Sequence, residues 1–128
     1  MTHVLVIDDN VDLRDMLRLV LQDGGYTVVD DVDGATLVDY LHTTPRGLVV
    51  LLDYYVPHLD TEALLAQVLT DPVLARRHAF ICVTASSRER LPPTFVALLS
   101  RLNVPLLTKP FDLDDLLVTI KQVEHRLH

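Results

Sequence analysis

Short apolar runs alternate along this chain with longer stretches in which apolar residues recur every three or four positions. The runs cover residues 4–7, 48–52, 80–83 and 104–107, and each is followed by a polar residue. Runs this short and this apolar are typical of strands that are covered on both faces, as in a parallel sheet. A fifth run, at residues 26–29, is more amphipathic and predicts a strand at the sheet edge.

The intervening stretches have the periodicity of amphipathic helices. They predict helices over residues 13–21, 37–41, 63–69, 95–102 and 113–127. Gly24-Gly25 ends the first helix, Pro72 follows the end of the third, and Asp112 is a candidate N-cap for the last. Strand and helix thus alternate five times, which predicts a parallel sheet with helices on both faces and right-handed crossovers. Pro105 lies within the last run and favours an edge position for that strand.

Composition and charge narrow the function classes. The 128 residues suffice for one domain, 49% of them are apolar, and the net charge is -7, which opposes binding to a nucleic-acid backbone. No apolar stretch is long enough to cross a membrane, and the N-terminus lacks the features of a secretory signal. The single cysteine, Cys82, allows no internal disulfide, so we expect a cytoplasmic protein. We expect one domain over residues 1–128 with no output domain.

Polar residues follow four of the predicted strands. Asp8 and Asp9 follow the first, Asp53 follows the run at 48–52, Thr84 follows the run at 80–83, and Lys109 follows the last. Ligands of open α/β sheets bind beyond the carboxyl ends of the strands. We therefore expect these residues from distant parts of the chain to meet in one crevice.

The charges of this group predict its chemistry. Three carboxylates repel one another, and one lysine offsets only one of their three negative charges. A divalent cation would offset the other two. Oxygen ligands with room for water suit Mg²⁺, whereas the six histidines lack zinc-ligand spacing and only one cysteine is present. A magnesium ion beside a carboxylate, a hydroxyl and a lysine forms a phosphoryl-transfer site. Asp53 is then the candidate nucleophile, and Thr84 and Lys109 neutralise the transferred oxygens.

These residues resemble the receiver domain of two-component response regulators. The resemblance covers essentially the whole chain and rests on Val4-Leu5-Val6-Ile7-Asp8-Asp9-Asn10, Leu51-Leu52-Asp53 with Pro57, Thr84-Ala85 and Lys109-Pro110-Phe111. It implies a flavodoxin-like (βα)5 three-layer sandwich with a central five-stranded parallel sheet of order 2-1-3-4-5. The helix predicted over residues 95–102, the strand at 104–107 and the helix over 113–127 would then form the face that carries the signal to a partner protein.

The resemblance also implies roles for individual residues. Asp53 would accept a phosphoryl group from a phosphohistidine of a sensor histidine kinase or phosphotransfer protein. Asp9, Asp53 and the Tyr55 carbonyl would bind Mg²⁺, with Asp8 acting mainly through water. The chain would catalyse only its own phosphorylation and hydrolysis, and so would not be an enzyme with a separate substrate. Its partners would be that kinase or phosphotransfer protein and an unknown downstream protein, a homodimer would add a second copy, and neither nucleic acid nor membrane is expected.

Three departures from the family pattern affect the expected switch. Leu106 replaces the usual aromatic residue, so the usual threonine–aromatic coupling is in question. Thr61 replaces a common glycine, so the turn into the third helix is expected to differ. The segment from Ser86 to Asn103 is longer than is typical and contains Pro92-Pro93, which predicts an atypical loop.

Two other functions compete with the phosphorylated receiver. A pseudo-receiver would act as an interaction scaffold without phosphorylation. Leu106 and the altered loop favour this alternative. The presence of all five residues expected for phosphoryl transfer opposes it: Asp8, Asp9, Asp53, Thr84 and Lys109. A phosphohydrolase of the haloacid-dehalogenase type would need an acid/base aspartate two residues after its nucleophile, where this chain has Tyr55. Labelling by a small acyl phosphate with Mg²⁺ separates the receiver from the scaffold.

Overall fold

The computed structural model describes residues 2–127, so Met1 and His128 of the predicted domain lie outside the described residues. Five strands form one parallel sheet in the order β2-β1-β3-β4-β5, which confirms the expected order 2-1-3-4-5. The strands are β1 (His3–Ile7), β2 (Thr27–Val29), β3 (Leu48–Asp53), β4 (Ala79–Thr84) and β5 (Leu106–Thr108). The helices are α1 (Val11–Asp23), α2 (Leu37–Thr43), α3 (Thr61–Thr70), α4 (Pro72–Arg77), α5 (Pro93–Leu102) and α6 (Leu113–Glu124), with a 3-10 turn, η1 (Arg88–Arg90), before α5.

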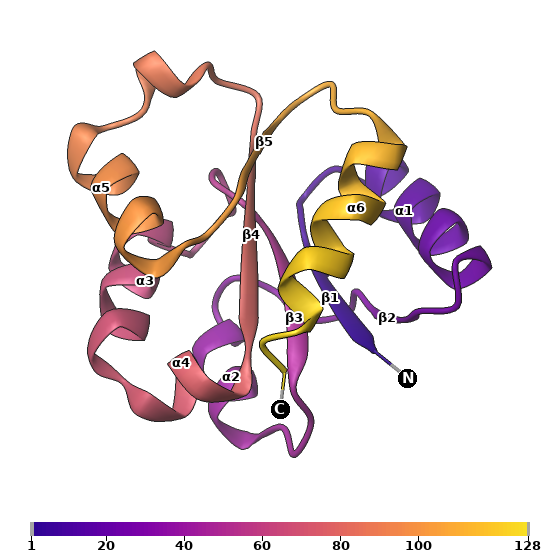
Figure 1. The fold of residues 1–128 in the computed structure, drawn as a ribbon, viewed down its shortest axis with the longest axis horizontal. Coiled ribbons are helices and arrows are strands. Elements are labelled where there is room, and N and C mark those ends of the chain that lie inside the picture. Colours follow the sequence, from indigo (N-terminus) through magenta and orange to yellow (C-terminus); the bar gives the residue numbers. More distant parts are fainter. Residues whose placement is uncertain (1, 128) are drawn as a thin grey trace.

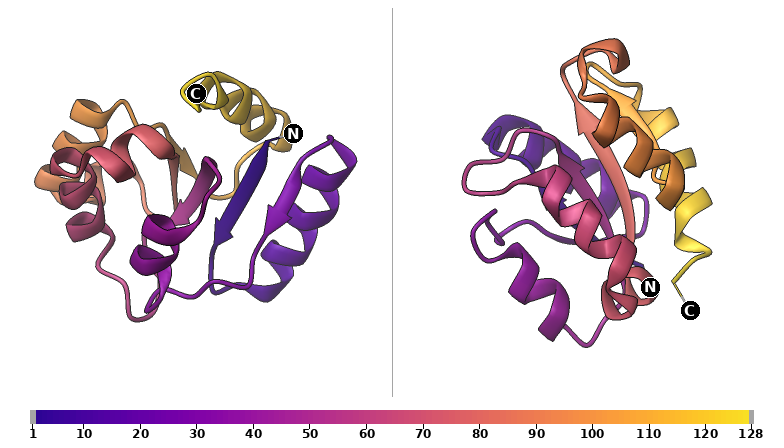
Figure 2. Two further views of the ribbon diagram at one scale, coloured as in Figure 1. Left: turned by 90° about the horizontal axis from the view of Figure 1, so that it is seen from below. Right: turned by 90° about the vertical axis from the view of Figure 1, so that its left-hand side faces the viewer.

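The helices cover the sheet in two layers (Figures 1 and 2). Helices α1 and α6 lie on one face, and α2 to α5 lie on the other. This arrangement is the three-layer sandwich expected from the alternation of strands and helices. No helix within residues 2–127 is long and apolar enough to span a bilayer.

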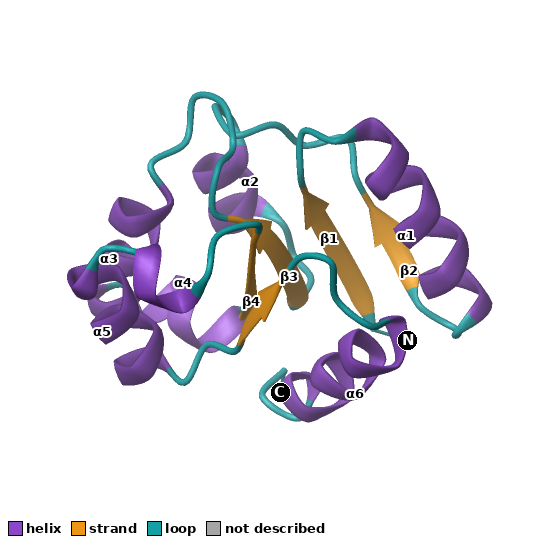
Figure 3. Cartoon of the chain, turned by 90° about the horizontal axis from the view of Figure 1, so that it is seen from above, coloured by secondary structure: helices purple, strands orange, loops and turns teal. Residues whose placement is uncertain are grey.

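Side chains of the central strands alternate between the two faces of the sheet, and helices cover both faces. In β3, Leu48, Val50 and Leu52 pack under α2 to α5, whereas Val49 and Leu51 pack under α1 and α6. Both faces of β3 are therefore apolar, and all six of its residues are buried. Only its last residue, Asp53, is charged, so the carboxylate lies at the carboxyl end of an otherwise apolar strand. Figure 3 shows β3 between β1 and β4, with a loop leading from the end of each strand.

The structure corrects several predicted boundaries. Strand β5 begins at Leu106 instead of residue 104, because Pro105 has no N–H to donate and contributes only its carbonyl, which accepts from the Cys82 N–H at 2.9 Å. Helix α4 was not predicted; Asp71 caps it and Pro72 begins it, so the proline both follows one helix and starts the next. The last helix ends at Glu124, before Leu127. The edge position of β5 is confirmed.

Candidate functional site

The first loop of the site is shaped by Asp8 and Asn10. Asp8 follows β1 and is only 8% exposed, and its Oδ1 accepts a hydrogen bond of 2.9 Å from the Asn10 N–H. The Asn10 side chain in turn accepts from the Leu13 N–H at 3.1 Å and caps α1. The chain thus turns sharply from strand to helix, and the second carboxylate oxygen of Asp8 is left to face the crevice.

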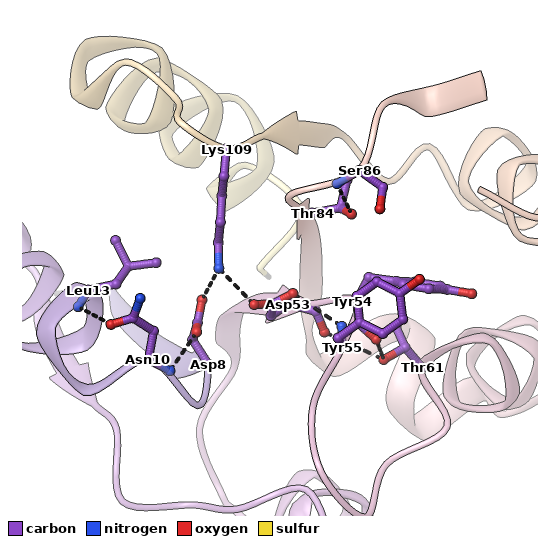
Figure 4. Close-up of polar contacts among 10 residues, drawn as sticks. All are labelled: Asp8, Asn10, Leu13, Asp53, Tyr54, Tyr55, Thr61, Thr84, Ser86 and Lys109. Atoms are coloured by element: carbon purple, nitrogen blue, oxygen red, sulfur yellow. Dashed lines mark hydrogen bonds and ion pairs between the residues drawn. The ribbon is translucent and has the colours of Figure 1, made fainter. Parts of the chain in front are cut away.

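Lys109 joins Asp8 and Asp53 at the centre of the site (Figure 4). Its Nζ lies 2.7 Å from Oδ2 of Asp8 and 2.7 Å from Oδ2 of Asp53. Lys109 reaches this place because its N–H donates to the Thr84 carbonyl at 2.7 Å, which fixes the loop after β5 against the end of β4. The Lys109–Pro110 peptide bond is cis.

Asp53 is held through both of its carboxylate oxygens. Oδ1 accepts from the Tyr55 N–H at 3.1 Å, and Oδ2 accepts from Lys109. Burial raises the pKa of Asp53 above its usual value of 3.8; the hydrogen bond from Lys109 opposes this, and the charge of Asp8 raises the pKa further. The single positive charge of Lys109 therefore does not balance the negative charges of the carboxylates in the site.

The pKa of Lys109 reflects the same imbalance. Burial lowers the pKa of this ammonium, but the hydrogen bonds to Asp53 and Asp8 and the negative charges of these two carboxylates together outweigh that effect, so the pKa lies above its usual 10.5. Lys109 is therefore a permanent cation at neutral pH, and its single charge cannot balance three carboxylates.

Asp8, Asp9 and Asp53 are placed to bind a cation. Each offers a carboxylate oxygen, and these oxygens all lie within 4.8 Å of one another. Asp9 is exposed whereas the other two are buried, so the group opens to solvent on one side. An all-oxygen set with one open side and a net charge near −2 fits Mg²⁺, which keeps several waters when bound. Within residues 2–127 no histidine belongs to such a group, and His128 lies outside the described residues.

Thr84 and Tyr55 border this centre without bonding to its carboxylates through their side chains. The Thr84 side chain is fully buried, and its Oγ1 accepts from the Ser86 N–H at 3.0 Å. Tyr55 is 64% exposed, and its ring lies edge-on to the Tyr54 ring, with the centroids 4.7 Å apart. The structure thus brings Asp8, Asp9, Asp53 and Lys109 together, with Thr84 and Tyr55 at the margin.

Two further residues contribute to the site and were not assigned this role from the sequence. Asn10 orders the Asp8 loop through its N-cap. Thr61, at the start of α3, is 3% exposed, and its hydroxyl donates to the Tyr54 carbonyl at 2.9 Å. Asn10 follows Asp8-Asp9 directly and is a residue type that commonly caps helices, so the sequence could have indicated its role. The partner of the Thr61 hydroxyl could not be found in this way, because it depends on how α3 packs near the end of β3.

Comparison with known proteins identifies the class of domain. The chain matches the family model of the response regulator receiver domain over residues 4–121, and it belongs to that family of two-component signalling domains. No curated protein matches the sequence.

Solved structures share the fold at low sequence identity. The receiver domain of the Francisella response regulator 1452 has a TM-score of 0.80 and 22% identity, with all of both chains covered. The Vibrio cholerae chemotaxis protein CheY4 has a TM-score of 0.74 and 23% identity, covering 96% of this chain and 98% of its own. The Thermotoga maritima response regulator TrrA, solved with Mg²⁺ and a beryllium fluoride, has a TM-score of 0.75 and 22% identity, covering 96% of this chain and 99% of its own.

Proposed function

We propose that this receiver domain accepts a phosphoryl group on Asp53 in the presence of Mg²⁺ and signals through a protein–protein surface. The observation that carries the proposal is the Asp53 carboxylate, which ends the central strand 2.7 Å from Lys109 and within one oxygen cluster with Asp8 and Asp9. The complex of the Thermotoga response regulator with Mg²⁺ and beryllium fluoride supports the same chemistry. This cluster does not favour a scaffold that works without phosphorylation.

The proposed donor is a phosphohistidine of a sensor kinase or phosphotransfer protein. A carboxylate oxygen of Asp53 forms the new O–P bond, the P–N bond to the histidine breaks, and the imidazole leaves with the electron pair of that bond. Asp9, Asp53 and the Tyr55 carbonyl would hold Mg²⁺, which when bound would neutralise charge on the phosphoryl oxygens, and Asp8 would act on that ion mainly through water.

The remaining side chains stabilise the transferred group. Lys109 exchanges its bond with Asp53 for one with a phosphoryl oxygen, which preserves a charge-assisted contact. The Thr84 hydroxyl, which already accepts from Ser86, donates its free hydrogen to another phosphoryl oxygen. Hydrolysis of the aspartyl phosphate then returns Asp53 to its carboxylate form. The domain is thus a self-modifying switch that converts no separate substrate.

The test is phosphorylation by a small acyl phosphate with Mg²⁺, followed by intact-mass measurement. We expect the mass of one phosphoryl group on the wild-type protein and none on Asp53→Asn. Asp60→Asn is the matched control: Asp60 lies at the end of the loop that follows Asp53, and it caps α3 by accepting a 2.9 Å hydrogen bond from the Ala63 N–H, a role that asparagine also fills. Equal labelling of Asp53→Asn and the control would assign the phosphoryl group elsewhere, and an unlabelled wild type would favour the scaffold.

A further inference from the structure

The structure assigns Thr61 as a positioning residue for the Asp53 carboxylate, an inference that rests on the proposed function. Thr61 is the first residue of α3 and lies eight positions after Asp53 in the sequence. Its side chain is buried, and its hydroxyl donates to the Tyr54 carbonyl at 2.9 Å (Figure 4). A second, longer contact of 3.5 Å joins the same hydroxyl to the Asp53 carbonyl. The shorter contact lies within the usual range of an O–H···O hydrogen bond, so it is the one that orients the peptide unit.

The Tyr54 carbonyl and the Tyr55 N–H belong to one peptide unit. A peptide unit is planar and rigid, and in the trans form its C=O and N–H point in opposite directions. Thr61 holds the carbonyl end of this unit, and the N–H end donates to Oδ1 of Asp53 at 3.1 Å. The hydroxyl of Thr61 therefore controls the direction in which this N–H points, and with it one of the two bonds that orient the carboxylate.

The chain is fixed just before this peptide unit, so the Thr61 hydroxyl acts on the peptide unit itself. The Tyr54 N–H is fixed by the Val83 carbonyl at 2.8 Å, and the Tyr54 ring packs on Phe95 with centroids 4.6 Å apart. Beyond it the chain leads to the Tyr55 carbonyl, the proposed Mg²⁺ ligand. Loss of the Thr61 hydroxyl would free the plane of the Tyr54–Tyr55 peptide unit to rotate and would also leave the Tyr54 carbonyl without this donor.

The test compares Thr61→Val with Thr61→Ser. Valine keeps the branched shape but removes the hydroxyl, whereas serine keeps the hydroxyl. Loss of supporting contacts around metal ligands typically weakens metal affinity by 10-fold or more, so we expect Thr61→Val to bind Mg²⁺ about tenfold more weakly by calorimetry. We expect its acyl-phosphate labelling at saturating Mg²⁺ to slow, and Thr61→Ser to restore both.

Amide exchange separates positioning from a structural role. In Thr61→Val the Tyr55 amide should exchange faster, whereas the Ala63 amide, which is capped by Asp60, should be unchanged. Thr61→Ala provides the same comparison if valine prevents folding. Wild-type-like Mg²⁺ affinity and Tyr55 exchange in a folded variant without the hydroxyl would overturn the inference alone. A wild-type protein that neither binds Mg²⁺ nor becomes labelled would instead overturn the proposed function.

Discussion

The ring of Tyr54 lies against the ring of Phe95, with the two centroids 4.6 Å apart and the planes at 60°. Tyr54 directly follows Asp53, and Phe95 is a fully buried residue of α5. Leu106, which replaces the aromatic residue common in the family, is only partly buried against the same core. The aromatic contact between the site and α5 therefore starts from the loop after β3, on the side of Asp53, rather than from β5.

This contact predicts where the phosphorylated state differs. We expect a beryllofluoride mimic with Mg²⁺ to change amide exchange within residues 86–103 more than at Leu106, because the ring pair joins Asp53 to α5. Tyr54→Leu should reduce the response of that segment, whereas Tyr40→Leu, a change to a half-buried tyrosine of α2, should not. Exchange that changes only near Leu106, with residues 86–103 unaltered, would contradict this prediction.

Mg²⁺ is expected to stabilise the folded protein. Ligand binding to the native state at about 100 times its Kd adds roughly 2.7 kcal/mol to the free energy of unfolding. The Tm should therefore rise with Mg²⁺, and Asp9→Ala should abolish the rise because it removes a proposed direct ligand. Asp12→Ala is the control, since Asp12 is an exposed acidic residue in the first turn of α1, outside the cluster. A normal Mg²⁺ response in Asp9→Ala would place the ion elsewhere.

The sequence predicted the architecture because the strands are short, apolar and separated by periodic helices. It did not resolve boundaries that depend on hydrogen bonds between strands: the apolar run began at Val104, yet pairing with β4 begins at Leu106. The apolar periodicity did not predict helix α4, because Pro72 also follows the end of the preceding helix and so indicates a terminator. The Asp71-Pro72 pair, an N-cap followed by a first-turn proline, was the local signal for that helix.

The candidate site was predictable as a meeting of strand ends, because the carboxyl ends of parallel strands share one edge. Asp8, Asp53 and Lys109 do meet there. The interactions of Thr61 could not be predicted, because its partner is a backbone carbonyl on another element. The sequence indicated only that a threonine in place of glycine would alter this turn, and the structure shows that it adds a hydrogen bond to Tyr54.

Tyr55 is predicted to lengthen the lifetime of the aspartyl phosphate. Its side chain projects from the residue whose N–H binds Asp53, and it rests on the Tyr54 ring at the margin of the site. A rigid ring there restricts the approach of water. We expect Tyr55→Ala to speed hydrolysis by up to about tenfold, which corresponds to roughly 1.4 kcal/mol of barrier. The decay of labelled protein measures this rate.

Tyr55→Phe tests the cause of that effect. Phenylalanine keeps the ring and removes the hydroxyl, so shielding by the ring predicts a lifetime close to that of the wild type. If the hydroxyl orients the attacking water instead, Tyr55→Phe and Tyr55→Ala would both lengthen the lifetime, and the shielding argument would be wrong. Mg²⁺ affinity should remain nearly unchanged in both variants, because only the backbone carbonyl of this residue is the proposed ligand.

His78 and His42 are predicted to affect stability with opposite dependence on pH. His78 is buried; its Nδ1 accepts from the Leu48 N–H at 3.1 Å, and its Nε2 lies 2.8 Å from the Leu41 carbonyl oxygen. The first contact requires the neutral ring, with the proton on Nε2. Burial lowers the pKa of His78 below its usual 6.5. His42 is more exposed, and its hydrogen bond with Asp71, 2.7 Å long, raises its pKa above 6.5.

The sign of each contribution follows from proton linkage. The unfolded chain binds a proton at residue 78 more readily than the folded one, so the contribution of His78 is complete above about pH 6.5 and is lost as the pH falls below it. The contribution of His42 is complete below that pH and is lost as the pH rises through the raised pKa of the folded state. Denaturant unfolding from pH 5 to 8 should therefore show a shallower acid-side decline in His78→Gln and a shallower alkaline-side decline in His42→Gln. Direct titration of both rings by NMR in the folded wild type checks the assignment without a variant, and a His78 ring that protonates above pH 6.5 would refute it.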